Sequence, residues 1–165
     1  MKNKWLVGAR LKTLPAAIVP VLVGTAGANR DLLNKSINLN LFVYALLVAL
    51  FLQVGVNYAN DYSDGIKGTD KNRIGPTRLV ASGLADAKSV KRAALICFLL
   101  AAIFGTLISV TTSYWFLLVG ALSILAAWGY TGGKKPYGYF GLGEIFVFIF
   151  FGVVATSCSY LIQTD

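Results

Sequence analysis

Five long apolar runs set the strongest limit on what this chain can fold into. They lie at residues 14–28, 39–56, 93–110, 114–130 and 142–162. A helix needs about 20 mainly apolar residues to cross the hydrocarbon core of a bilayer, and most of the runs come close to that length. Only 13% of the residues are charged, against about 25% in a soluble domain. We therefore predict an all-α integral membrane protein, with about five transmembrane helices in a single domain over residues 1–165.

The distribution of Lys and Arg predicts how this bundle lies in the membrane. Thirteen of the fifteen basic residues fall in the N-terminal segment and in the connections after the second and fourth runs. The other two, Arg30 and Lys35, lie between the first two runs. Because Lys and Arg are enriched on the cytoplasmic side, we expect a multi-pass protein of the inner or plasma membrane with a cytoplasmic N-terminus. The net charge of +8 then reflects topology in a lipid bilayer, and no nucleic acid partner is expected.

Two residue types restrict the possible chemistry. The sequence contains no histidine, which excludes histidine metal ligands, Ser-His triads and histidine general bases. Both cysteines, Cys97 and Cys158, lie inside apolar runs, so we interpret them as small packed side chains. The candidate chemistry lies instead in the acids, amides and bases.

A polar stripe begins inside the second apolar run. At about 100° per residue, Asn57, Asp61 and Asp64 fall within about 60° of one another, with Gln53 near the same stripe. Such oxygen ligands suit Mg²⁺, which takes one or two protein carboxylates and commonly bridges to phosphate. A helix end that reaches water would contain the same residue types. The position of Gln53 favours a functional site, because polar groups inside a membrane are costly.

The connection between residues 58 and 92 mixes acids with bases. It holds four of the seven acids and seven of the fifteen bases. A solvated loop would show the same mixture. A site for Mg²⁺ and diphosphate would also require it, because carboxylates hold the metal while Lys or Arg bind the remaining phosphate oxygens.

The segment YTGGKKPYGYFGLGE, residues 130–144, follows the fourth run. Its Gly-Gly-Lys-Lys is not a P-loop, since that motif needs a glycine at position 128 and a Ser or Thr at position 135. The segment is either a plain turn or a second part of the site. Tyr130 and Lys134 would project together if the helix continued past Tyr130. Glu144 suits the start of the fifth helix as well as it suits a catalytic role.

Taken together, these motifs resemble the UbiA superfamily of intramembrane prenyltransferases. The matching segments are RLKTLPAAIVPVLVG (10–24), NYANDYSDGIKGTD (57–70), GPTRLVASG (75–83) and YTGGKKPYGYFGLGE (130–144). The aspartate motif alone is similar in several branches of the superfamily. Its combination with the first and last segments resembles the bacterial branch that prenylates 1,4-dihydroxy-2-naphthoate in menaquinone synthesis. The resemblance implies a multi-helix UbiA-type bundle.

The resemblance also implies roles for individual residues. Asn57, Asp61 and Asp64 would hold Mg²⁺ against the diphosphate of a polyprenyl donor. Tyr130 and Lys134 match the tyrosine and lysine that approach the same diphosphate, and with the two aspartates they are the predicted catalytic residues. The further predicted substrate contacts are Arg10, Asn60, Asp70, Arg73, Arg78 and Tyr137.

The expected reaction follows from these charges. Mg²⁺, Lys134 and the loop bases would neutralise the leaving diphosphate, and the rings of Tyr58, Tyr62, Tyr130 and Tyr137 would stabilise the allylic cation. By resemblance, an aromatic acceptor then attacks the cation and loses its carboxylate as CO₂. One alternative is another acceptor such as 4-hydroxybenzoate. A second, from a different class, is a transporter or channel fragment with aspartates along a cation pathway.

One departure from the family pattern concerns length. The resemblance implies nine membrane helices and a second aspartate-rich loop between the sixth and seventh. This sequence ends at Asp165, after the fifth apolar run. We therefore expect either a fragment or one half of an enzyme that a second chain completes, with little or no activity on its own.

Overall fold

A computed structural model describes residues 3–31, 36–69 and 75–164 of the chain. Within these ranges every regular element is helical, which confirms the all-α prediction. The elements in chain order are α1 (Lys4–Ala9), the 3₁₀ helix η1 (Leu11–Thr13), α2 (Pro15–Asp31), α3 (Leu39–Lys67), α4 (Ala87–Thr111), α5 (Trp115–Gly129), the 3₁₀ helix η2 (Tyr137–Phe140), α6 (Gly143–Val147), the π-helix η3 (Phe148–Val154) and α7 (Ala155–Thr164).

The helices match the five predicted runs in order but differ from them in length. Helices α3 and α4 and the continuous Gly143–Thr164 segment are long and apolar enough to cross a membrane. The first run corresponds to α2, which meets the Lys4–Thr13 segment at a 48° bend and qualifies as a span only together with it. Helix α5 is apolar but has 15 residues, about 22 Å, against a hydrocarbon core of about 30 Å.

Helix α3 organises the bundle and extends well past the predicted end of its run at residue 56. It begins at Asn38, whose side chain accepts hydrogen bonds from the backbone N–H groups of Asn40 and Leu41. It ends at Gly68, which adopts the left-handed conformation (φ 71°) that glycine tolerates best. The polar stretch therefore remains helical and carries its side chains on regular faces.

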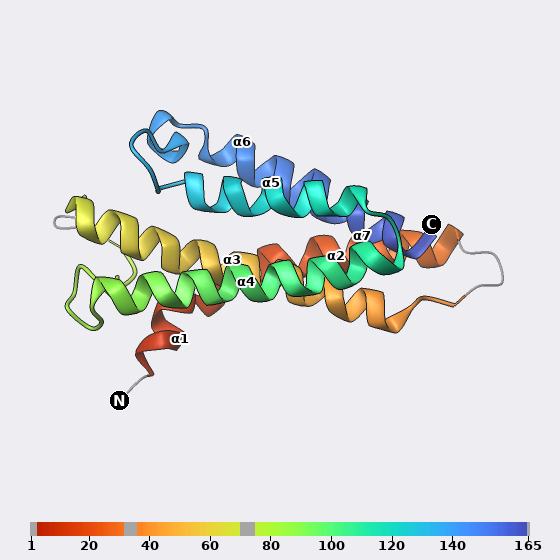
Figure 1. Cartoon of the computed structure of the whole chain (residues 1–165), viewed down its shortest axis with the longest axis horizontal. Helices are drawn as coiled ribbons and strands as arrows, with labels where there is room; N and C mark the ends of the chain where they lie inside the picture. Colours follow the sequence, from red (N-terminus) through yellow and green to blue (C-terminus); the bar gives the residue numbers. More distant parts are fainter. Residues whose placement is uncertain (1–2, 32–35, 70–74, 165) are drawn as a thin grey trace.

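Two pairs of helices approach each other closely at glycines. A Cβ atom added to Gly55 of α3 would lie 2.6 Å from the Phe98 ring of α4. One added to Gly24 of α2 would lie 2.2 Å from the Thr156 carbonyl oxygen of α7. Small residues allow helix backbones in membranes to pack closely, so these two contacts fix the α3–α4 and α2–α7 pairs that run side by side in Figure 1.

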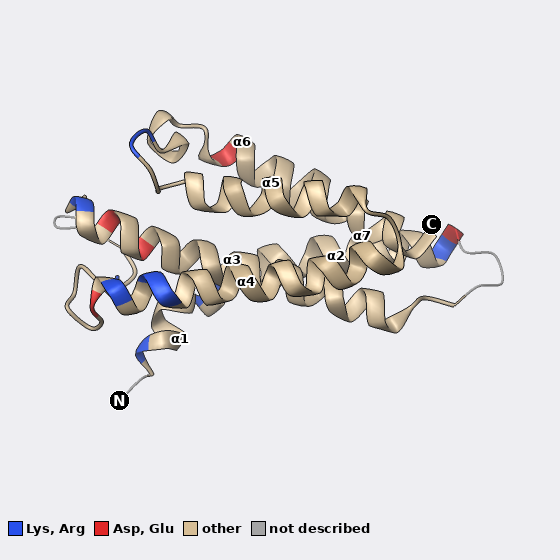
Figure 2. Ribbon diagram, viewed as in Figure 1, with Lys and Arg blue, Asp and Glu red and all other residues tan. Residues whose placement is uncertain are grey.

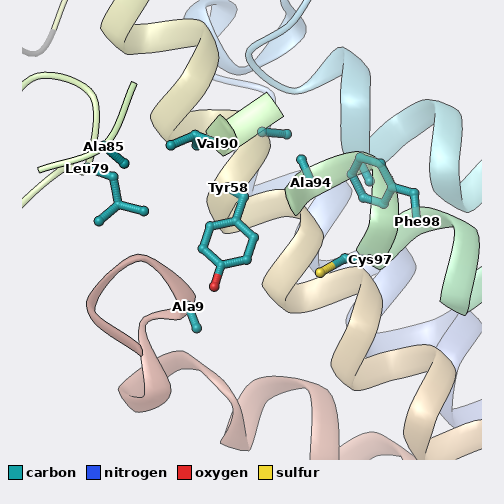
Figure 3. Packing of buried hydrophobic residues seen from close by; sticks show 10 residues of the cluster. Ala9, Tyr58, Leu79, Ala85, Val90, Ala94, Cys97 and Phe98 are labelled. Atoms are coloured by element: carbon teal, nitrogen blue, oxygen red, sulfur yellow. The ribbon is translucent and has the colours of Figure 1, made fainter. Parts of the chain in front are cut away.

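Buried apolar residues form two clusters at different levels of the bundle. The first joins α3 and α4 to the N-terminal segment and to Leu79, and Figure 3 shows Tyr58 pointing toward Ala9 within it. The second holds α2, α3, α4, α5 and α7 together farther along, and its buried members are Ala17, Val21, Leu41, Ala45, Ala49, Ile108, Phe116 and Ile162. The first cluster supports the polar end of α3.

Charged residues concentrate at one end of the bundle. Figure 2 shows them at the end of α3, the start of α4 and the connection after α5, while α2 carries a basic and an acidic residue at the opposite end. This arrangement agrees with the uneven distribution of Lys and Arg among the connections of the sequence. The polar stripe of α3 therefore lies at the charged end.

Candidate active site at the charged end of the bundle

The C-terminal end of α3 presents two rows of polar side chains where the sequence predicted one stripe. We call Gln53, Asn57 and Asp61 the elbow-facing row, because they contact the bent N-terminal segment Lys4–Thr13, the elbow. We call Asn60, Asp64 and Lys67 the loop-facing row, because they contact the segment that follows α5. Both rows follow the spacing of one helix face, and only Lys67 among the six is exposed.

The two amides of the elbow-facing row hold the elbow in place. The Asn57 side-chain nitrogen donates to the Ala9 carbonyl at 2.9 Å and to the Thr13 hydroxyl at 3.0 Å. Gln53 donates to the same hydroxyl at 3.0 Å. Between these anchor points Arg10 adopts a left-handed backbone conformation (φ 52°), which costs a non-glycine residue roughly 1–2 kcal/mol. The two amides thus stabilise a turn that Arg10 would not favour by itself.

Asp61 completes the elbow-facing row and joins three separate segments. Its side chain is fully buried. It accepts hydrogen bonds from the Arg10 guanidinium of the elbow, from Arg78 Nη1 at 2.8 Å, and from the Leu79 backbone N–H at 3.0 Å. The other guanidinium nitrogen of Arg78, Nη2, lies 3.9 Å from Asp64 Oδ2. Two arginines and two aspartates thus form one buried charge cluster, as buried charges require partners.

The loop-facing row fastens the segment after α5 to α3. Asp64 accepts a hydrogen bond from the Tyr139 hydroxyl at 2.5 Å, and Asn60 accepts one from the Thr131 hydroxyl at 2.8 Å. Lys67 donates to the Thr131 carbonyl at 2.6 Å and lies over the Tyr139 ring, 5.1 Å from its centre. The loop therefore closes over the end of α3 through polar side chains.

A cavity of about 300 Å³ lies between the helices and reaches this polar end. Its lining along α3 extends from Ala45 to Asn60, about 22 Å of helix. Most of the lining is apolar and comes from α3, α5 and the Gly143–Thr164 segment. The polar residues that line the charged end of the cavity are Gln53, Asn57, Asn60, Tyr130 and Tyr137. The cavity thus joins an apolar chamber to a polar head.

Of the four tyrosines predicted near the reaction, two line the cavity. The Tyr130 and Tyr137 rings meet edge to face with centres 5.6 Å apart. Burial, with a smaller contribution from Tyr130, raises the pKa of Tyr137 to about 12, so it stays protonated and donates to the Ala126 carbonyl at 2.8 Å. Tyr58 instead donates to the Trp5 carbonyl at 2.8 Å. Tyr62 stacks on Trp128 outside the cavity lining.

The predicted pairing of Tyr130 with Lys134 required α5 to continue past Tyr130, and it does not. The helix ends at Gly129. Tyr130 turns to the cavity, whereas Lys134 is exposed in the following turn, with no hydrogen bond or ion pair to the parts of the chain that the structure describes. Asp70 and Arg73, two further predicted contacts, lie outside the described residues.

The predicted Mg²⁺ ligands differ in how well they suit a metal. The residues described contain no cluster of three or more acidic or cysteine side chains. Asp61 has its carboxylate surrounded by two guanidinium groups and a backbone N–H, so it does not fit as a ligand in this arrangement. Asp64 carries one hydroxyl donor and a more distant arginine, and Asn57 engages the elbow only through its nitrogen. Their oxygens suit Mg²⁺, which commonly uses one carboxylate with substrate phosphate.

Several residues of the site were missed in the sequence. Lys67 stands three residues after Asp64, so its place in the second row was readable from helical spacing. Thr13, Thr131 and Tyr139 had no such signal, because their contacts with α3 bridge 40 or more residues of sequence.

Comparison with known proteins identifies the family. The model of the UbiA prenyltransferase family matches residues 17–165. The chain is 51% identical over 152 residues to 1,4-dihydroxy-2-naphthoate octaprenyltransferase of Mycobacterium tuberculosis, covering 92% of this chain and 51% of the relative. It is 39% identical over 166 residues to the Escherichia coli protein of the same name, with coverage of 96% and 53%.

The chain spans about half the length of the curated relatives it matches. Bacillus subtilis has a relative of the same name that is 32% identical over 157 residues, covering 94% of this chain and 50% of the relative. The family model covers both polar rows and the cavity-lining helices. This protein belongs to the UbiA prenyltransferase family.

Proposed function

We propose that this protein transfers a polyprenyl group from polyprenyl diphosphate to 1,4-dihydroxy-2-naphthoate in menaquinone biosynthesis. The observation that carries the proposal is the buried cluster of arginines and aspartates beside an apolar cavity within a membrane bundle. A substrate with a charged head and a long apolar tail matches both parts. The names of the bacterial relatives supply the acceptor.

The charged end would bind the diphosphate. Arg10 and Arg78 supply guanidinium donors, which suit phosphate oxygens. Lys134, exposed in the turn after α5, adds a flexible cation at the same end. Asp64 and Asn57 are the residues suited to hold Mg²⁺, which when bound would act as a Lewis acid on the diphosphate. These groups stabilise the negative charge that grows as the diphosphate leaves.

The cavity would hold the polyprenyl tail and exclude water from the reacting carbon. Its lining is mostly apolar over about 22 Å of α3. Exclusion of water matters because water would quench an allylic cation. Tyr130 and Tyr137 lie where the chamber meets the polar head, and their ring faces can stabilise a cation by roughly 0.5–2 kcal/mol each.

The transfer then proceeds by substitution on the acceptor ring. The C–O bond to the diphosphate breaks, and the diphosphate keeps the electron pair. The ring carbon that bears the carboxylate bonds to the allylic carbon, and the carboxylate leaves as CO₂ with its electrons returning to the ring. The concentration of Lys and Arg in the N-terminal segment and the connections after α3 and α5 supports a multi-pass protein of the inner membrane with this charged end in the cytoplasm.

The test is a transfer assay with labelled polyprenyl diphosphate, Mg²⁺ and either 1,4-dihydroxy-2-naphthoate or 4-hydroxybenzoate. Because the relatives are about twice as long, the assay uses this chain alone and co-expressed with the C-terminal half of the Escherichia coli relative. We expect the co-expressed halves to prenylate the naphthoate with release of CO₂, and this chain alone to show little or no transfer. Transfer only to 4-hydroxybenzoate would show that this compound, and not the naphthoate, is the acceptor. Cation flux through proteoliposomes without any prenyl transfer would contradict the enzyme assignment and indicate a transporter.

A further inference from the structure

The hydrogen bonds of Asp61 differ from those expected of a metal ligand. We propose that Asp61 is a positioning residue, which holds Arg10 and Arg78 together as a paired binding site for the diphosphate and does not itself bind Mg²⁺. The proposal rests on the proposed function, since it assigns the work of a residue within the same site. The proposal gives Asp61 and Asp64 different roles, although the two residues belong to one motif in the sequence.

The first support is that most of the acceptor capacity of Asp61 is already used. A carboxylate offers about four lone-pair sites on two oxygens. Arg10 and Arg78 both donate to Oδ1, and the Leu79 N–H donates to Oδ2. Two guanidinium groups already balance the charge of this carboxylate. A divalent cation at the same oxygens would meet both of them at close range in a fully buried position, where like charges repel most strongly.

The second support is that the two arginines come from segments far apart in the sequence, and Asp61 is the carboxylate to which both donate. Arg10 lies on the elbow, 51 residues before Asp61, and Arg78 lies on the connection 17 residues after it. Two adjacent buried guanidinium groups repel each other unless a carboxylate lies between them. Asp61 supplies that carboxylate and also anchors the Leu79 backbone, so it fixes both the charge and the direction of the pair.

The third support is a donor on Arg10 that has no protein partner. Its Nε is buried, and no hydrogen bond to it exists within residues 3–31, 36–69 and 75–164. Buried guanidinium donors normally have acceptors. A phosphate oxygen is the natural acceptor for such a donor, because guanidinium groups bind phosphate through two N–H groups at once. Arg10 thus uses Nη2 for Asp61 and keeps a second donor for an anion.

The experiment measures binding of inorganic pyrophosphate to the purified full chain in detergent, first with EDTA and then with saturating Mg²⁺. Asp61→Asn is compared with Asp64→Asn, the same change of acid to amide one helical turn away. Asp86→Asn, at the start of α4 and outside the cluster, is the control for a lost negative charge at this end of the bundle.

We expect Asp61→Asn to weaken pyrophosphate binding in EDTA by about tenfold or more, since it releases two arginines that make charge-assisted hydrogen bonds. The ratio of affinities with and without Mg²⁺ should stay close to that of the wild type. Asp64→Asn should do the reverse, with the Mg²⁺ enhancement lost. Arg10→Ala added to Asp61→Asn should cause little further loss, because both changes break one unit.

A metal-ligand role for Asp61 predicts the opposite pattern of pyrophosphate binding. If Asp61 only bound Mg²⁺, removing its charge would leave binding in EDTA unchanged or stronger and would abolish the enhancement by Mg²⁺, and this result would overturn the proposal. If Asp61→Asn does not fold, Asp61→Glu keeps the charge but shifts the carboxylate, and the same two readings apply. A wild-type chain that binds no pyrophosphate in either condition would overturn the proposed function itself.

Discussion

The two polar rows of α3 have the same helical spacing but different surroundings. The elbow-facing row ends in a fully buried aspartate with three donors from two other segments. The loop-facing row ends in an exposed lysine and contacts a tyrosine that is 48% exposed. Hydrogen bonds that water can reach contribute less than buried ones. We infer that the first row holds the two arginines of the site, and that the second row fastens a loop over it and contributes Asp64.

The largest expected difference between the rows lies at their aspartates. Asp61→Ala leaves two guanidinium groups without their buried carboxylate, and breaking a buried pair costs about 3–5 kcal/mol. Asp64→Ala removes one hydroxyl contact and a 3.9 Å ion pair, so we expect roughly 1–2 kcal/mol. Thermal or denaturant unfolding in detergent measures both. Equal losses of stability for the two variants would break the distinction between the rows.

The amides provide a matched pair of smaller effects. Asn57→Leu removes two hydrogen bonds to the elbow, while Asn60→Leu removes one bond to Thr131. We expect about 2 kcal/mol for the first and about 1 kcal/mol for the second. Limited proteolysis should cut the N-terminal elbow only in Asn57→Leu. Cleavage after α5 in that same variant would show that the two rows are not independent.

Tyr139→Phe tests the loop-facing row with a smaller change. The variant keeps the ring under Lys67 and loses the hydroxyl that donates to Asp64. Because Tyr139 is half exposed, we expect less than about 1 kcal/mol of lost stability. If the loop closes the site during transfer, the rate should fall several-fold while pyrophosphate binding changes little. Unchanged rates would show that the hydrogen bond between Tyr139 and Asp64 has no part in the reaction.

Asp86 lies outside both rows, and its substitution should have the smallest effect on stability. Hydrogen bonds from Ser89 lower the pKa of its carboxyl in the folded chain, where it caps α4. A lowered folded pKa means that the stabilisation is present above the ordinary pKa of aspartate and is lost as pH falls through the folded value. The melting temperature of Asp86→Ala should therefore be slightly lower than the wild type at pH 7 and equal to it at strongly acidic pH. A difference in melting temperature that persists at strongly acidic pH would contradict this role of the Asp86 carboxylate.

Helix positions and the polar character of α3 were readable from the sequence, whereas the division of labour within α3 was not. Spacing fixes the angle at which Asn57, Asp61 and Asp64 leave the helix. It does not say which segment lies opposite each angle. The partners of Asp61 are set by tertiary contacts with Arg10 and Arg78, and helical period carries no information on contacts over 51 and 17 residues.

The end of α5 illustrates the same limit at a local scale. Nothing in the apolar pattern around Gly129 distinguishes a helix that stops from one that continues for another turn. The helix ends before a turn in which Gly133 adopts a left-handed conformation (φ 76°) and Thr131 is bonded to Asn60 and Lys67 of α3. Tyr130 and Lys134 separate for that reason, and the pairing expected from their spacing does not form.

The threefold contact at Asp61 also has a consequence for biogenesis in the bilayer. A lone ionised carboxylate is costly to bury, so the polar end of α3 can settle only when the elbow and the 75–86 connection have both arrived. Translation delivers those segments on either side of α3. We expect the buried charge cluster to form only after the 75–86 connection has been synthesised, so that a shorter nascent chain leaves Asp61 without its full set of donors.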